Sequence, residues 1–216
     1  MRSYTTTQII AKEGWNQIAI VLMVFLCAYA LSFLSWIFFG LFIVTLLFYR
    51  NPERLDAEED SHAIIAPMDG QISAISKVNA NDGKEWLRVV IRKRIVDVGV
   101  LRAPMIISKM EIKKRFGLPL SGTSHLSKAL REKVVLTCKG LHAEMKMVLY
   151  AGALSQKIQL FEKMGGLKRS ERFAFLNDGE VALLLPLNTR IQVVLNDEVK
   201  AGESVLGYLA HRVNHE

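Results

Sequence analysis

The pattern of hydrophobic and polar positions divides the chain into an apolar N-terminal run and a longer region of short, alternating segments. From Gly14 to Tyr49 no residue carries a charge. An uncharged apolar run of about 18 or more residues is typical of a segment that crosses a membrane. A secretory signal peptide fits less well, because the run is longer than a signal's apolar region and no small-residue cleavage site follows it.

The apolar run is long for a single crossing. As one helix it would extend about 54 Å, whereas the hydrocarbon core of a bilayer is about 30 Å thick. We therefore expect a helical hairpin that turns near Leu31 to Trp36, where Ser32 and Ser35 could satisfy backbone groups. One long tilted helix is the alternative. Basic residues flank both ends of the run, which favours a hairpin whose two ends stay in the cytoplasm.

The region after the run has the pattern of a β protein. Short apolar or alternating segments are separated by Gly, Asn and Asp, which predicts a compact, mostly antiparallel β domain. Residues 198–207 are predicted to form a strand, a turn and a second strand, and residues 125–133 a short helix or an ordered loop. The other expected strands are 71–78, 85–94, 144–152, 157–164, 180–186 and 189–195.

These patterns predict four parts. Residues 1–13 are expected to be a cytoplasmic N-terminal segment, 14–49 a membrane hairpin, 50–62 a polar linker and 63–216 the β domain. Cys27 lies in the apolar run and Cys138 in the β domain, so no disulfide between them is expected.

The chain is basic, with a formal net charge of +7 and clusters at 92–94, 113–115 and 167–169. Beside a membrane anchor, such clusters predict anionic phospholipid as a partner. A solvated surface of mixed charge is the alternative. No recognition helix or base-stacking aromatic motif accompanies the charge, so nucleic acid is not an expected partner.

Seven segments occur in the order in which one known family carries them. They are "FYRNPER" (48–54), "IIAPMDGQI" (64–72), "VDVGVLRAPM" (96–105), "KALREK" (128–133), "YAGALSQKI" (150–158), "GLKRSERFAFLNDGEVALLLP" (166–186) and "VKAGESVLG" (199–207). Over nearly its whole length the chain closely resembles the short bacterial form of phosphatidylserine decarboxylase. The resemblance implies the β fold of that family behind a membrane anchor.

The resemblance also implies a particular chemistry. The enzymes of this family cleave their own chain at a Gly-Ser pair, and the serine becomes a pyruvoyl group that takes up electrons when carbon dioxide leaves the substrate. An aspartate and a histidine assist. The family aspartate matches Asp69, but the family histidine corresponds to Gly99, and the serine falls at Gly179 or Asp178. None of the chain's 14 glycines is followed by serine. No cofactor is therefore expected, because the pyruvoyl group cannot form by the usual route.

Two of the matched residues have a second interpretation. Asp69 precedes a glycine, and an Asp-Gly pair is also a common turn. Arg102 is a candidate lipid-binding residue that would hold a carboxylate or a phosphate, or else it anchors the end of a strand.

No other polar residue is expected to replace the missing serine or histidine. Thr123 follows a glycine far upstream of the cleavage position, and Ser170 is expected to make hydrogen bonds in a turn. His125 and His142 could reach a pocket but are expected to be structural or solvated. His142 and Glu144 could lie on one strand face, yet no further ligand accompanies them, so no metal site is predicted.

The sequence thus leaves three hypotheses. The first is a noncatalytic, membrane-anchored relative in phospholipid metabolism, which binds anionic or amino phospholipid head groups or pairs with an active family member or another membrane protein. The second is an active decarboxylase that makes phosphatidylethanolamine by a divergent route. The third is a structural membrane protein that binds no head group. We expect the bacterial inner membrane as its location, with the β domain facing the cytoplasm.

Overall fold

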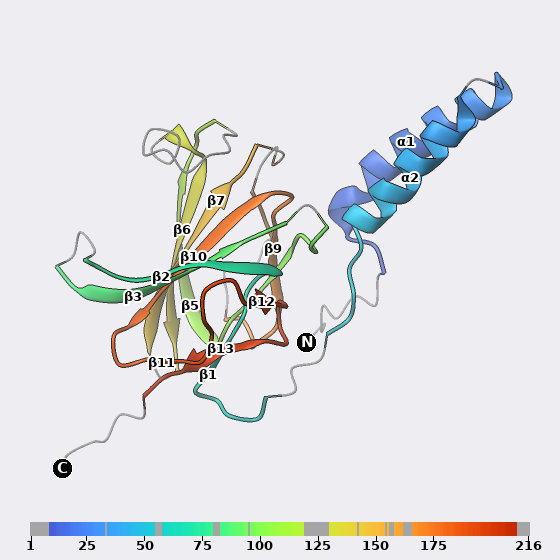
Figure 1. The fold of residues 1–216 in the computed structure, drawn as a ribbon. Coiled ribbons are helices and arrows are strands. Elements are labelled where there is room, and N and C mark those ends of the chain that lie inside the picture. The colour runs from blue at the N-terminus through green and yellow to red at the C-terminus, as the bar shows by residue number, and fades with distance from the viewer. Residues whose placement is uncertain are drawn as a thin grey trace, which may run out of the picture. The chain divides into compact units, whose positions relative to one another are not determined.

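The computed structural model describes residues 9–32, 34–54, 58–79, 83–94, 96–118, 130–141, 143–153, 155, 158–161 and 166–210. The chain divides into two compact units, Met1–Glu53 and Arg54–Glu216. The first is helical and the second is built from antiparallel sheets (Figure 1). The expected fold class, mostly β with an apolar helical segment at the N-terminus, is confirmed.

The N-terminal unit is a helical hairpin. A short 3-10 turn, η1 (Lys12–Gly14), leads into α1 (Trp15–Ala30), and α2 (Ser35–Phe48) returns beside it (Figure 1). The apolar run therefore forms two helices. In the turn the backbone enters the left-handed region, with φ of 51° at Ser32 and 44° at Leu34.

Aromatic side chains hold the two helices of the hairpin together. The ring of Phe25 lies 5.6 Å from that of Phe39 and 6.5 Å from that of Phe42. The outer surface is apolar as well; Trp36, for example, is 86% exposed. Among the described residues one helical segment, Lys12–Ala30, is long and apolar enough to cross a membrane, and Ser35–Phe48 is shorter.

Backbone hydrogen bonds join the two ends of the hairpin. Ala11 N–H donates to the Tyr49 carbonyl at 2.9 Å, and Asn51 N–H donates to the Ile9 carbonyl at 2.7 Å. These two bonds form a short antiparallel bridge that fixes where the chain enters and leaves the hairpin.

The β unit is organised around one seven-stranded antiparallel sheet, with two small sheets beside it. The large sheet has the order β12 (Glu198–Val199), β2 (Gly70–Asn79), β3 (Glu85–Arg92), β10 (Gly179–Pro186), β7 (Glu144–Ala151), β6 (Lys133–Gly140) and β5 (Ile107–Arg115). One small sheet contains β1 (Ala63–Ile65), β13 (Val205–Tyr208) and β11 (Arg190–Ile191). The other contains β4 (Val100–Arg102), β9 (Arg172–Phe175) and β8 (Gln159–Leu160).

The main core lies on one face of the large sheet. Alternate residues of β10, namely Val181, Leu183 and Leu185, are fully buried in it. On the opposite face, Ala182 packs with Val90 and Val148 in a second, smaller cluster. The central strand is therefore apolar on both sides, which explains why its sequence reads as a continuous hydrophobic run.

Two expected strands are much shorter than predicted. In the segment 157–164 only Gln159–Leu160 is a strand among the described residues, and 157 and 162–165 lie outside them. In 189–195 the strand ends at Ile191, because the chain turns at Val194 to Asp197, where the Asp197 carboxylate accepts the Val194 N–H at 2.8 Å. The expected helix or loop at 125–133 lies largely outside the described residues, and strand β6 begins at its last residue.

Candidate functional site

Two of the positions matched to the family's reactive residues, Asp69 and Gly179, lie at one end of the large sheet. Strands β2 and β10 begin at this end and β3 finishes there, with Gln71 and Glu180 both paired to Arg92. Asp69 directly precedes β2, and Gly179 is the first residue of β10. The chain after β3 stays close, because Lys93 N–H donates to the Gly179 carbonyl at 3.0 Å.

Asp69 is buried in an ion pair with Arg54. Asp69 is 6% exposed as a whole residue, and its carboxylate accepts two parallel hydrogen bonds from the guanidinium, one from Nη1 to Oδ1 and one of 2.6 Å from Nη2 to Oδ2. Ala201 N–H adds a third bond to Oδ1 at 2.8 Å. Arg54 Nη1 also donates to the Ala201 carbonyl at 2.9 Å, so the three residues form a closed arrangement.

The charges around Arg54 keep it protonated. Burial alone would lower the pKa of Arg54, but the hydrogen bond and negative charge of Asp69 outweigh it, and the pKa is raised. The Glu203 carboxylate, 3.6 Å from Nε, adds to this effect. A carboxylate whose two oxygens already accept bonds from a charged arginine is poorly placed to take a proton from a substrate.

Arg102 ends strand β4 inside the same cluster of charges. Its N–H donates to the Pro67 carbonyl at 2.8 Å and its Nη1 to the Ser170 carbonyl at 3.0 Å. The side chain is 7% exposed. Burial, followed by the positive charges of Arg172 and Arg54, lowers the pKa of Arg102 to about 10. An anion bound here would relieve the repulsion between these cations.

Ser170 contributes to this region through its backbone. It lies in a turn at φ 63°, where its N–H donates to the Ala103 carbonyl at 2.9 Å and its carbonyl accepts from Arg102. The hydroxyl, which the sequence led us to expect as the hydrogen-bonding group of the turn, makes no hydrogen bond among the described residues. The turn is thus held by main-chain bonds.

The space beside Gly99 is occupied by Phe175. A Cβ atom on Gly99 would lie 2.9 Å from Phe175 Cζ and 2.9 Å from the Leu176 carbonyl oxygen. Phe175 is 2% exposed, and Leu176 N–H donates to the Gly99 carbonyl at 2.8 Å. Since contacts of this length are essentially never seen for a real Cβ, a histidine at this position would require the neighbouring chain to move.

Gly179 has no room for a side chain either. Its φ is 146°, a conformation that residues other than glycine rarely adopt, and an added Cβ would lie 2.0 Å from the Tyr150 carbonyl oxygen. The preceding residue, Asp178, accepts the Gly152 N–H at its carbonyl at 2.8 Å. The chain therefore runs from Asp178 and Gly179, the two positions to which the resemblance assigns the family's serine, directly into strand β10.

Of the remaining sequence candidates, only Glu144 lies within the described residues. Thr123, His125 and His142 lie outside the described residues, and Glu144 begins β7, where it pairs with Lys139. Within the described ranges there is no group of three or more His, Cys, Asp or Glu residues that could hold a metal ion.

Sequence reasoning missed two residues that shape the site. Arg54 was noted only as a charge beside the apolar run, and Phe175 only as part of an expected family segment. The sequence "FYRNPER" was a signal for Arg54, because it is shared with the family, but no local pattern connects Arg54 to Asp69. The contact between Gly99 and Phe175 joins segments far apart in the chain.

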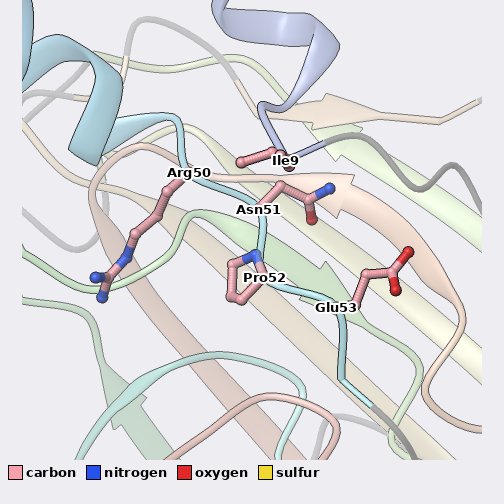
Figure 2. Close-up of a pocket in the computed structure, with 5 residues that line it drawn as sticks. All are labelled: Ile9, Arg50, Asn51, Pro52 and Glu53. Atoms are coloured by element: carbon pink, nitrogen blue, oxygen red, sulfur yellow. The ribbon is translucent and has the colours of Figure 1, made fainter.

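A separate cavity lies at the neck of the hairpin. It has a volume of about 410 Å³ and is lined by Ile9, Arg50, Asn51, Pro52 and Glu53 (Figure 2). Figure 2 shows the side chains of Arg50 and Glu53 extending away from each other on either side of Pro52. None of these residues matches a reactive position of the family.

Comparison with known proteins agrees with the resemblance seen in the sequence. A family model described as phosphatidylserine decarboxylase matches residues 41–207. The phosphatidylserine decarboxylase proenzyme of Geobacter sp. (strain M21) is 31% identical over 179 residues, which cover 80% of this chain and 80% of that protein. The proenzyme of the same name from Paraburkholderia phymatum is 29% identical over 211 residues, which cover 93% of this chain and 97% of that protein.

Proposed function

Because this chain belongs to the phosphatidylserine decarboxylase family, we propose that it is a noncatalytic member that keeps the family's fold and acts on phospholipid membranes by binding rather than by chemistry. The observation that carries the proposal is the packing of Gly179. Gly179 is, with Asp178, one of the two positions assigned to the family's serine; its φ of 146° and the 2.0 Å between an added Cβ and the Tyr150 carbonyl oxygen leave no room there for a serine side chain.

Two further features support this proposal. The ring of Phe175 fills the space beside Gly99, where the family has its histidine. Asp69 is retained, but both of its oxygens are engaged by Arg54. Under this proposal, each of the three reactive positions is either replaced or used for structure.

The membrane location is part of the proposal. Residues 14–49 would form the membrane hairpin, between a cytoplasmic segment at 1–13 and a linker at 50–62 that leads to the β domain at 63–216. The apolar outer surface of the helices and the length of Lys12–Ala30 support this assignment. Basic residues on both sides of the run support an inner-membrane protein whose β domain faces the cytoplasm.

Arg102 is the residue that we propose to bind a lipid head group in the β domain. It lies among the cations Arg54 and Arg172, so a phosphate or a carboxylate would be attracted to it. Replacing Arg102 by Gln should weaken the binding of short-chain phosphatidylserine to the detergent-solubilised protein, and Lys77→Gln, on the exposed part of β2, should not. Unchanged binding in Arg102→Gln would exclude this role.

The mass of the purified polypeptide tests the central claim. We expect a single chain with the mass of all 216 residues, because there is no Gly-Ser pair to cleave. The Geobacter proenzyme, prepared in the same way, is the positive control for processing. Two fragments, the smaller one blocked at its N-terminus by a pyruvoyl group, would overturn the noncatalytic assignment.

An active decarboxylase is the second candidate, since the family membership and the retained Asp69 favour it. This hypothesis requires a different electron sink and predicts release of carbon dioxide from carboxyl-labelled phosphatidylserine by the purified protein. We expect no release above that of protein unfolded by heat. Co-purification of an active family member with this chain would instead support a role as its partner.

A further inference from the structure

The structure distinguishes among the three basic clusters of the sequence. In the cluster 92–94, Arg94 contacts the Asp97 carboxylate at 3.3 Å and the Glu198 carboxylate at 2.5 Å, and Lys93 is buried. In the cluster 167–169, Arg169 donates hydrogen bonds to the carbonyls of Glu58 and Asp60. In each of these clusters an arginine is therefore engaged within the β unit, while Arg92 and Lys168 are exposed.

The cluster Lys113 to Arg115 is different. Its three side chains are exposed, and none of them makes a hydrogen bond or an ion pair with another described residue. They lie at the end of β5, which is the edge strand of the large sheet. Along this strand Met110 is buried, Ile112 is half-buried and Lys114 is exposed, so the strand runs out beyond the core.

Apolar side chains stand next to these charges. Phe116 is 77% exposed, Leu118 is 55% exposed and Leu130 is 47% exposed. Leu118 and Leu130 are held together, because the Leu118 N–H donates to the Leu130 carbonyl at 2.9 Å. We call Lys113 to Leu118, together with Leu130, the β5 tip.

Within the β5 tip, the backbone at Gly117 packs closely against the backbone at Leu130. A Cβ on Gly117 would lie 2.4 Å from the Leu130 carbonyl oxygen, so the two segments touch at this point. Two acidic residues lie close in sequence to the tip: Glu111 of β5, which is exposed and lies 3.9 Å from Lys109, and Glu132, which is half-buried and is followed by Lys133. The tip consequently combines three unneutralised cations with three exposed apolar side chains.

We propose that the β5 tip binds the surface of an anionic membrane, with Lys113, Lys114 and Arg115 at the phosphates and Phe116, Leu118 and Leu130 in the interfacial layer. Basic side chains are attracted to anionic lipid, and an aromatic residue beside them favours the head-group region. An RNA would be bound mainly through the charges and would leave the exposed leucine side chains unexplained. The inference rests on the proposed membrane location and adds a second contact to that of the hairpin.

An environment-sensitive fluorophore on the tip tests this contact in the full-length protein. The label is attached at Leu118→Cys in a Cys27→Ser background, and Cys138 stays unlabelled because it is buried. The protein is reconstituted through its hairpin into phosphatidylcholine vesicles with or without phosphatidylglycerol. A label at Leu141→Cys is the control, because Leu141 is 71% exposed and follows the opposite end of β6.

We expect the label at 118 to shift to shorter emission wavelength on anionic vesicles only, and the label at 141 to stay unchanged. The variant Lys113→Gln/Lys114→Gln/Arg115→Gln should lower the ratio of membrane-bound to free tip by on the order of a hundredfold. The variant Lys77→Gln/Lys139→Gln/Lys200→Gln removes the same net charge from exposed sites elsewhere and should behave like the wild type.

Four results would overturn the inference: no shift on anionic vesicles, an equal shift on neutral vesicles, an equal loss in both triple variants, or the same shift when RNA or an acidic peptide is added to neutral proteoliposomes. Flotation of the reconstituted protein measures the membrane location separately, and the mass of the chain measures processing. A result that contradicts membrane binding by the β5 tip can thus be distinguished from a result that contradicts the proposed function.

Discussion

The carbonyl oxygen of Tyr150 lies 2.0 Å from the position that a Cβ atom would take on Gly179. Strand β10 pairs with β7 on one side and with β3 on the other, and Gly179 itself is paired with Ala151. Gly179, which with Asp178 is one of the two positions assigned to the family's serine, is therefore built into a sheet with partners on both sides. We expect that changing this one side chain does not restore a nucleophile there.

Restoring a Gly-Ser pair is accordingly expected to fail. In the variant Asp178→Gly/Gly179→Ser the new Cβ meets the Tyr150 carbonyl, so we expect no self-cleavage and a free energy of unfolding lower by about 2 kcal/mol or more. Intact mass and urea unfolding measure the two effects.

Gly83→Ser is the matched control for this variant. Gly83 also has a positive φ, 73°, but nothing lies within 4 Å of an added Cβ. Gly83→Ser should lower the free energy of unfolding by only about 1 kcal/mol, which is the cost of a left-handed backbone conformation for a residue other than glycine. A processed or fully stable Asp178→Gly/Gly179→Ser protein would contradict the packing argument.

The ion pair between Arg54 and Asp69 is expected to contribute to stability rather than to chemistry. Both side chains are 8% exposed, so Asp69→Ala leaves a buried guanidinium without its bidentate partner and should cost about 3 to 5 kcal/mol. The double variant Arg54→Met/Asp69→Leu should lose much less unfolding free energy than Asp69→Ala, because it leaves no buried charge without a partner. Urea unfolding of the detergent-solubilised chain measures both.

The exposed pair of Arg94 and Glu198 is the control for this measurement. Its side chains are 45% and 65% exposed, so Glu198→Ala should cost at most about 1 kcal/mol. If Asp69→Ala lowered the free energy of unfolding no more than Glu198→Ala does, the ion pair between Arg54 and Asp69 would not stabilise the fold as we propose.

The sequence predicts the sheet more reliably than it predicts the site. Alternation of apolar and polar residues identified most long strands, including β2, β3, β7 and β10, because one or both faces are buried. The short strands β8 and β11 were predicted too long, since their ends are set by turns and not by hydrophobicity. The hydrogen bond from Ala201 to Asp69 spans 132 residues, and no local pattern indicates it. Family resemblance marked Asp69, Gly99 and Gly179, but only the fold reveals what surrounds each one.

Gly99 and Phe175 should behave as a coupled pair. In Gly99→Ala the new methyl group meets the Phe175 ring and the Leu176 carbonyl, which should lower the free energy of unfolding by about 1 to 3 kcal/mol. Phe175→Leu opens space at the same point. The double variant should therefore be more stable than the sum of the two single effects predicts, by at least about 0.5 kcal/mol.

A control for Gly99→Ala is Gly40→Ala, because nothing lies within 4 Å of a Cβ at Gly40. It should not destabilise the protein. Strict additivity of Gly99→Ala and Phe175→Leu would show that the ring does not occupy the histidine position.

Stability at alkaline pH should depend on Cys138. Burial raises the pKa of its thiol from 9.0 to about 12. Below pH 9 the thiol is protonated in both the folded and the unfolded chain, so Cys138 adds no pH dependence to the free energy of unfolding. Above pH 9 only the unfolded chain loses the proton, and the free energy of unfolding falls by up to about 1.4 kcal/mol per pH unit until the folded thiol also ionises. Cys138→Ala should lose this dependence while it keeps that of Tyr150, whose pKa is also raised by burial. The difference between the two unfolding free energies, followed from neutral pH upward, should therefore shrink above pH 9, and parallel curves would show that the thiol is ionised as easily in the folded chain as in the unfolded one.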